Sequence, residues 1–188
     1  SIWANLNSLA LATAPSLYNQ KAPKLKVLKV VDRAEINSNE VITFKLNFKP
    51  NAFTKFKSGD LLAIYPNNDS VERFYSIGKV DNSLQLIVRL HPNGLGSEFL
   101  YNLHKGATIK ARVIKNTHFH FPKKATKVAL ISNGTGIAPF LGMVDENKSK
   151  LETHLYCGFR NNDELTKKYS KIAHKYISKQ KLSTFNLA

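Results

Sequence analysis

The stretch RFYSIGKV, residues 73–80, carries side chains that suit a flat ligand with phosphate groups. It lies in a region where apolar and polar residues alternate, so we expect a strand on which Arg73 and Tyr75 share one face. An arginine can bind a phosphate through two parallel hydrogen bonds, and an aromatic ring can stack on a flat heterocycle. Ser76 adds a small hydroxyl beside them. The stretch therefore predicts a site for a phosphorylated aromatic ligand.

Two glycine-containing turns precede predicted helices. Gly134, Gly136 and Pro139, in NGTGIAPF, stand where a dinucleotide fingerprint would have three glycines. The third position departs from that fingerprint, but glycines let a ligand approach the backbone, and N–H groups at a helix start attract anions. Residues 94–97, in NGLGSEFL, repeat the arrangement, with the hydroxyl of Ser97 as a further donor. Each turn alone also fits a tight bend without a ligand, whereas both turns together with the strand above favour a nucleotide site.

The elements that must position these residues are strands over the first two thirds of the chain. From residue 24 to residue 121 apolar residues recur with a period of two, most clearly at 42–48, 84–90 and 109–113. Short alternating strands joined by turns are typical of an antiparallel barrel. We therefore expect a six-stranded antiparallel barrel over residues 24–125.

The pattern changes after Pro122. Apolar runs and helical patterns then alternate, at 127–132, 138–149, 153–159, 163–179 and 182–187. The order strand, helix, strand, helix, strand is typical of a parallel sheet with covering helices, so we expect a parallel α/β domain over residues 126–188. The first residues, SIWANLNSLALA, have helical spacing and are followed by proline, so 1–23 are expected to be the end of a helix and a linker.

Composition limits the function classes. Lys and Arg number 28 against 13 Asp and Glu, and the net charge of +15 could attract nucleic acid, anionic lipid or an acidic protein. The lysines are scattered, so a solvated basic surface is the simpler interpretation. Cys157 is the single cysteine, which excludes a disulfide within the chain and favours a reducing compartment. No apolar stretch reaches the roughly 20 residues that cross a bilayer, and we expect a cytoplasmic protein or the cytoplasmic part of a tethered one.

An ordered series of motifs resembles the ferredoxin-NADP reductase superfamily. The series is GDLLAIYPNN, RFYS, GLGS, HFHFP, GTGIAPF and YCGFR, and it covers roughly residues 24–188. It is most similar to the reductase domain of sulfite reductase flavoproteins and related diflavin enzymes. Six motifs in order are far more specific than any one of them. The diflavin enzymes have a helical insertion between the motifs that correspond to GDLLAIYPNN and RFYS. This chain has only residues 69–72 there, so it is a compact version.

The resemblance implies roles for particular residues. Arg73 would meet the flavin phosphates, Tyr75 would stack on the isoalloxazine beside Phe74, and Ser76 would lie near the reactive N5. The flavin pyrophosphate would be held by Gly94, Leu95, Gly96 and Ser97. The pyrophosphate of the pyridine nucleotide would be lined by Gly134, Thr135, Gly136 and Pro139, with Arg160 as a further candidate. The implied cofactors are FAD in preference to FMN, and NADPH or NADH as electron donor.

The implied function is hydride transfer from NADPH to FAD, followed by electron delivery to an acidic electron carrier or a flavodoxin-like domain. The family continues with further strands beyond the position of Ala188, and residues 1–12 resemble the last helix of a flavodoxin-like domain. We therefore expect part of a flavodoxin–reductase fusion, which alone binds flavin but is reduced little by NADPH. A free-standing flavin, ferredoxin or ferric reductase stays open as an alternative. A basic barrel that binds nucleic acid is the alternative from another class, resting on the net charge of +15 alone.

Two further patterns have structural interpretations. His118 and His120 would point the same way on a strand, but the sequence offers no third ligand, so we expect no metal site. Cys157 lies in an apolar run beside Gly158, so we expect a small buried side chain and no nucleophile.

Overall fold

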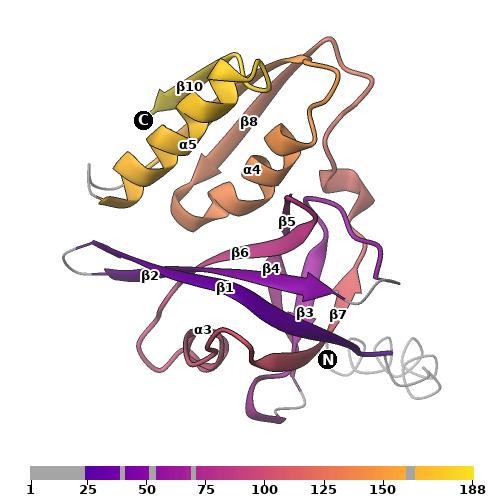
Figure 1. The fold of residues 1–188 in the computed structure, drawn as a ribbon, viewed down its shortest axis with the longest axis vertical. Helices are drawn as coiled ribbons and strands as arrows, with labels where there is room; N and C mark the ends of the chain where they lie inside the picture. The colour runs from indigo at the N-terminus through magenta and orange to yellow at the C-terminus, as the bar shows by residue number, and fades with distance from the viewer. Residues whose placement is uncertain (1–23, 39–40, 51–53, 69–70, 160–163) are drawn as a thin grey trace, which may run out of the picture.

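The computed structural model describes residues 24–38, 41–50, 54–68, 71–159 and 164–188. The expected helix end and linker at 1–23, and Arg160, lie outside these described residues. The described chain forms an antiparallel barrel followed by a small parallel sheet with helices (Figure 1). No helix in these described ranges is both long and apolar enough to cross a membrane.

The barrel is a single antiparallel sheet. Its strands are β1 (Lys26–Ser38), β2 (Val41–Pro50), β3 (Leu61–Ile64), β4 (Arg73–Ser76), β5 (Gly78–Val80), β6 (Ser83–Arg89) and β7 (Thr108–Ile114). They lie in the order β4-β3-β7-β1-β2-β6-β5, and each neighbouring pair is antiparallel. Only Ile77 separates β4 from β5, which form the two ends of this order, so one continuous segment closes the sheet. The expected six-stranded barrel is confirmed, with β4 and β5 as the two halves of its closing strand.

The barrel interior is filled by the apolar members of the alternating pattern. Phe44, Leu46 and Phe48 of β2 have no exposed surface, and Leu100 of α3 (Leu95–Tyr101) packs with them. Each such fully buried side chain stabilises the fold by roughly 1.5–3 kcal/mol relative to an exposed one. Burial of α3 against the barrel places the start of this helix beside the closing strand.

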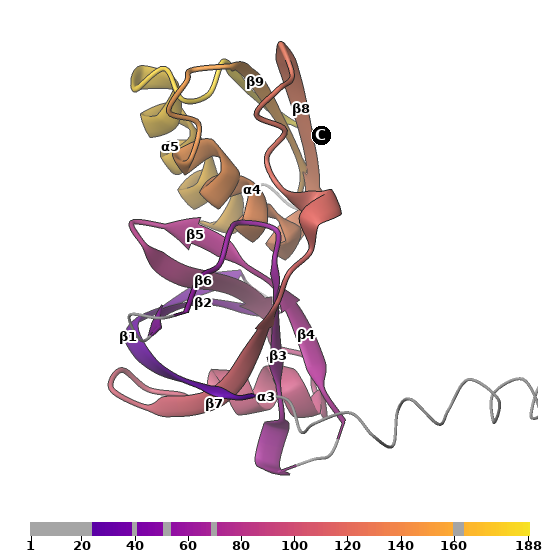
Figure 2. The ribbon, with the colours of Figure 1, turned by 90° about the vertical axis from the view of Figure 1, so that its right-hand side faces the viewer.

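The second part of the chain is a three-stranded parallel sheet with two helices. In chain order the elements are β8 (Lys127–Asn133), α4 (Ile137–Asp145), β9 (Glu152–Gly158), α5 (Glu164–Ser178) and β10 (Thr184–Leu187), and the sheet order is β10-β9-β8. Both helices cover the same face of this sheet (Figure 2). On the opposite face Ile131 is 73% exposed and Tyr156 is 43% exposed. The expected α/β arrangement is therefore confirmed.

Helix α4 ends at Asp145, four residues earlier than the helical pattern predicts. The reason is the buried side chain of Asn147. Its amide nitrogen donates to the carbonyls of Leu151 and Lys181, and its amide oxygen accepts the Leu151 N–H. These bonds hold residues 147–151 in a turn, which short-range periodicity does not reveal.

The barrel and the α/β part share a buried interface. Ile36 of β1 and Ile87 of β6 belong to the apolar cluster that fills the α/β part, so two barrel strands contribute to its core. Helix α4 lies directly on β5, as Figures 1 and 2 both show. Residues 137–144 of α4 are accordingly all buried. The first turn of α4 is thus held close to the strand that follows Ser76.

Candidate functional site

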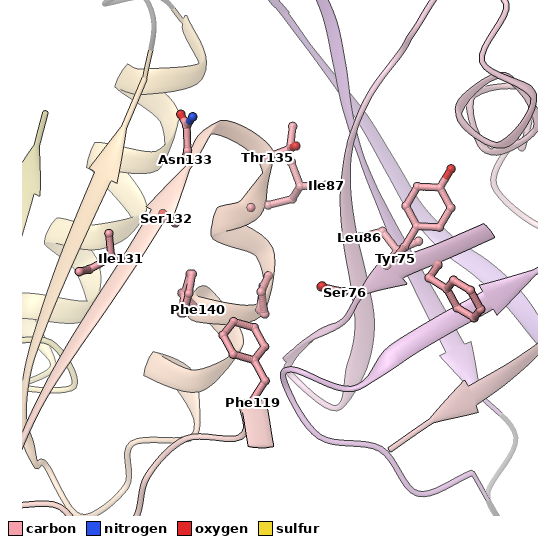
Figure 3. A pocket seen from close by; sticks show the side chains of 13 residues that line it. Tyr75, Ser76, Leu86, Ile87, Phe119, Ile131, Ser132, Asn133, Thr135 and Phe140 are labelled. Carbon is pink, nitrogen blue, oxygen red and sulfur yellow. The ribbon is translucent and has the colours of Figure 1, made fainter. Parts of the chain in front are cut away.

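A cleft of about 460 Å³ lies between the barrel and the α/β part (Figure 3). Its lining residues come from both parts and are Phe74, Tyr75, Ser76, Leu86, Ile87, Phe119, Ile131, Ser132, Asn133, Thr135, Gly136, Pro139 and Phe140. Cavities of this size are typical of small-molecule and cofactor sites. The barrel wall and the α/β wall face each other across the cleft, so a ligand could contact both.

On the barrel wall, side chains alternate along β4. Arg73 and Tyr75 are half-buried on one face, and Phe74 and Ser76 are exposed on the other, as strand geometry predicts. Partial burial raises the pKa of the Tyr75 phenol, against the opposing effect of the nearby Arg73 charge. The phenol is therefore neutral at physiological pH and presents a flat, uncharged ring.

The start of α3 packs against this same face of β4. A Cβ atom built on Gly96 would lie 2.5 Å from the Tyr75 hydroxyl oxygen and 3.1 Å from Cγ of Arg73. The structure therefore brings Arg73, Tyr75 and the glycine-containing turn at 94–97 together. An arginine, an aromatic ring and the first turn of a helix are thus neighbours there, with Gly96 and Ser97 of that turn buried.

Ser97 differs from the expectation that it offers a hydroxyl to a phosphate. The residue is 6% exposed, and its hydroxyl donates to the carbonyl of Gly94 at 3.0 Å and accepts the N–H of His91 at 3.1 Å. These bonds fix the turn at 91–94 instead. An anion at this helix start would thus meet backbone N–H groups and the guanidinium of Arg73.

A charged pair that the sequence did not reveal lies beside Arg73. Arg112 of β7 binds both carboxylate oxygens of Glu72, and the hydroxyl of Tyr65 donates to the same carboxylate at 2.6 Å. The hydrogen bonds from Arg112 lower the pKa of Glu72. Arg73 itself donates from Nη1 to the carbonyl of Val71 at 2.8 Å. This network fixes the backbone at the entrance to β4.

On the opposite wall, residues Gly134–Gly136 form a single turn that leads directly into α4. Gly134 has a φ of +50°, a conformation that favours glycine. Among the described residues outside the local chain, no heavy atom lies within 4 Å of a Cβ built on Gly134 or Gly136. The space beside this backbone is therefore open toward solvent or the cleft, which fits the close approach of an anionic group.

Two aromatic residues narrow the cleft. Phe119 comes from the segment between the barrel and β8, and its ring meets that of Phe140 on α4 edge to face, with centroids 5.4 Å apart. Both line the cleft (Figure 3). Sequence reasoning did not select them, although HFHFP and GTGIAPF contain them.

The segment that carries Phe119 is fixed by a buried carboxylate. Oδ1 of Asp60 accepts the Asn116 N–H at 3.0 Å and lies 2.6 Å from Nε2 of His120. Burial alone would raise the pKa of Asp60, but the hydrogen bonds from His120 and from backbone N–H groups lower it below its usual value. The expectation that His118 and His120 share one side of a strand was wrong, since His118 lies in the turn Thr117–Phe119 and His120 follows it. Among the residues that the structure describes, no group of three or more His, Cys, Asp or Glu side chains gathers as metal ligands.

Of the predicted site residues, the cleft is lined by Phe74, Tyr75, Ser76, Thr135, Gly136 and Pro139. The turn at 94–97 lies behind Tyr75, outside this lining. Cys157 is buried, and burial raises the pKa of its thiol against a hydrogen bond from Ser132. The prediction of a small buried side chain at Cys157 is confirmed.

Relatives of known function match parts of this chain. NADPH–cytochrome P450 reductase from Salmo trutta is 34% identical over 103 residues, which make up 49% of this chain and 16% of that protein. The sulfite reductase [NADPH] flavoprotein alpha-component from Shewanella oneidensis is 30% identical over 127 residues, or 61% of this chain and 21% of that protein. The chain thus matches about a fifth or less of the length of these two relatives. No family model matches the chain.

Solved structures match nearly the whole chain. A ferredoxin-NADP+ reductase from Plasmodium falciparum, solved with 2′P-AMP, has a TM-score of 0.72 at 21% identity and covers 87% of this chain and 72% of its own. A flavohemoglobin from Malassezia yamatoensis, solved with bound FAD and heme, has a TM-score of 0.65 at 18% identity and covers 92% of this chain and 47% of its own. At these identities the likeness establishes the fold.

Proposed function

Since the chain has the fold of the ferredoxin-NADP+ reductase superfamily, we propose that it is an NADPH-dependent flavoprotein reductase module, with an FAD-binding barrel at 24–125 and a nucleotide-binding α/β domain at 126–188. The observation that carries the proposal is the cleft itself. Tyr75 and Ser76 line it on the barrel wall, and Thr135 and Gly136 line it on the α/β wall. A hydride donor on the second wall would therefore face an acceptor on the first.

The barrel wall suits FAD. Tyr75 offers a ring for stacking, Arg73 a charge for the phosphates, and the start of α3 its backbone N–H groups. Ser76 lies on the cleft side of β4, where its hydroxyl can form a hydrogen bond with the edge of a bound flavin. The flavohemoglobin with the same fold was solved with bound FAD, which supports the choice of cofactor. When bound, FAD supplies the hydride-accepting and one-electron chemistry.

The α/β wall suits the pyrophosphate of a pyridine nucleotide. Its support is the open backbone at Gly134 and Gly136, because a phosphate can approach a glycine closely only where side chains leave room. Thr135 and Pro139 line the cleft beside them, and Arg160 stays a candidate for the same ligand. The names of two relatives specify NADPH, which makes it the preferred donor. The contribution of the chain is to orient the two cofactors and exclude water between them.

The electron acceptor is proposed to be an acidic carrier or a flavodoxin-like domain. The support is the net charge of +15, because opposite charges steer association of redox partners. We also propose a cytoplasmic location, for which the support is the single free cysteine, Cys157.

The test is spectroscopic. The purified chain is mixed with FAD, separated from free FAD by gel filtration, and scanned in the visible range. Bound flavin should appear in stoichiometric amount and bleach with dithionite, and NADPH should bleach it in the natural polypeptide that contains these residues. A chain that retains no flavin, or one that instead binds oligonucleotides with a steep dependence on salt, contradicts the proposal.

A further inference from the structure

Strand β5 and helix α4 are in direct backbone contact at Gly78. A Cβ atom built on Gly78 would lie 2.2 Å from the carbonyl oxygen of Ala138 and 3.0 Å from its carbonyl carbon. Both atoms belong to the backbone of α4, so a neighbouring side chain cannot make room by changing rotamer. Any side chain at this position has to move the helix or the strand.

The helix presents small residues to this strand. Ala138 and Gly142 are four residues apart and therefore lie on one face of α4. A Cβ atom on Gly142 would lie 2.4 Å from the backbone nitrogen of Lys79 and 2.3 Å from Oγ of Ser58, which accepts the Lys79 N–H. Small residues on both elements thus let the backbone of α4 rest on the backbone of β5 along more than one helical turn.

In sequence, the contact between Gly78 and Ala138 is the same number of residues from each wall of the cleft. Gly78 follows Ser76 by two residues, and Ala138 follows Gly136 by two residues. The contact is therefore only two residues from each wall, so a change in the separation of β5 and α4 should be passed on to the walls.

We propose that Gly78 is a positioning residue. It sets the distance between the barrel wall and the α/β wall, and thereby the alignment of the two cofactors for hydride transfer. The inference rests on the function proposed above. A Cβ atom at position 78 would lie 2.2 Å from the carbonyl oxygen of Ala138, whereas non-bonded atoms prefer a separation of roughly 3.5 Å. The strand and the helix would therefore have to move apart by about 1 Å. Misplacement of reacting groups by about 1 Å can lower a rate by about a hundredfold. Gly78→Ala should therefore slow flavin reduction by about that factor while both walls keep their own side chains.

Three variants separate alignment from general destabilisation. Gly78→Ala acts two residues from each wall, and Gly142→Ala acts at the same interface but six residues from Gly136. Ile77→Val is the control, because Ile77 is fully buried in the barrel cluster and its truncation weakens packing there without adding an atom toward α4. Denaturation midpoints of the three variants show how much each one loses in stability.

The measurements are made on the natural polypeptide that contains these residues. They are the FAD dissociation constant, the rate of flavin reduction over a range of NADPH concentrations, and amide hydrogen exchange at residues 134–138 without cofactors. The expected result is a limiting rate that falls about a hundredfold in Gly78→Ala, less in Gly142→Ala and less than twofold in Ile77→Val. FAD affinity and the half-saturating NADPH concentration should change by less than about threefold, since binding on each wall is retained. Hydrogen exchange at 134–138 should accelerate only in the two glycine variants.

The outcomes distinguish this inference from the proposed function. A wild-type protein that takes up no FAD overturns the proposed function. A wild-type protein reduced by NADPH, with Gly78→Ala reduced equally fast, overturns the role of Gly78 alone. Rates that fall in proportion to lost stability, whatever the position, also overturn it. Should Gly78→Ala fail to fold, Gly142→Ala against Ile77→Val decides by the same criteria.

Discussion

Gly96 in α3 is the position where one methyl group should most directly disturb the proposed flavin site. Its Cβ would lie 2.5 Å from the hydroxyl oxygen of Tyr75, about 1 Å closer than the optimum for non-bonded atoms. The Tyr75 ring must then withdraw by a comparable distance, and Arg73, at 3.1 Å, must also shift slightly. Stacking of a base on an aromatic ring contributes roughly 1–3 kcal/mol. Loss of about half of that, or about 0.5–1.5 kcal/mol, raises the FAD dissociation constant of Gly96→Ala by about two- to twelvefold.

The assay is a titration of the chain with FAD, followed by quenching of flavin fluorescence. Tyr75→Phe removes the atom that the new methyl group would strike, so the double variant Gly96→Ala/Tyr75→Phe should recover most of the lost affinity. Gly136→Ala is the matched control, because its methyl group enters open space on the other wall and should leave FAD affinity unchanged. Unchanged affinity in Gly96→Ala, or a double variant no better than the single one, would refute the reasoning that places the flavin against Tyr75 and α3.

Three further predictions follow from the same geometry. Arg73→Lys keeps the positive charge but loses the planar guanidinium, so FAD retention on gel filtration should fall, and equal retention would make Arg73 a surface residue. The pKa of Asp60 is lower in the folded protein than in the unfolded chain, where it is about 4. Its ionised form therefore stabilises the fold fully above about pH 4, and this stabilisation is lost as the pH falls through the folded-state pKa. Asp60→Asn should therefore cost about 1–3 kcal/mol at neutral pH and flatten the acid limb of stability against pH, which urea titrations at several pH values measure. Electron transfer to an acidic carrier should slow as ionic strength rises. A rate that does not change with salt would mean that the positive charge forms only a solvated surface and does not attract the carrier.

The architecture could be predicted because its signals are local. A period of two specified the barrel strands, and the change of period after Pro122 specified the parallel sheet. The grouping of Arg73, Tyr75 and residues 94–97 was expected from the resemblance, and the contact at Gly96 now gives it a geometry. What the sequence did not reveal are pairs between distant residues. Asp60 meets His120 across 60 positions, and Glu72 meets Arg112 across 40, with no periodicity that relates the partners.

Gly78 and Gly136 show why sequence motifs alone could not tell a glycine that the fold requires from one that suits a ligand. Gly78 and Gly136 both lie close to the cleft in the chain, yet they are glycines for opposite physical reasons. At Gly78 a methyl group would strike the backbone of α4 at 2.2 Å, so the fold itself requires the small residue. At Gly136 φ is −62°, a value any residue adopts, and a methyl group would meet no described atom outside the local chain within 4 Å. Gly136 is the N-cap of α4, where glycine is preferred to alanine, so helix capping and the open space for a ligand both favour glycine there. Substitution of Gly78 should accordingly displace α4, whereas substitution of Gly136 should weaken binding of the pyridine nucleotide.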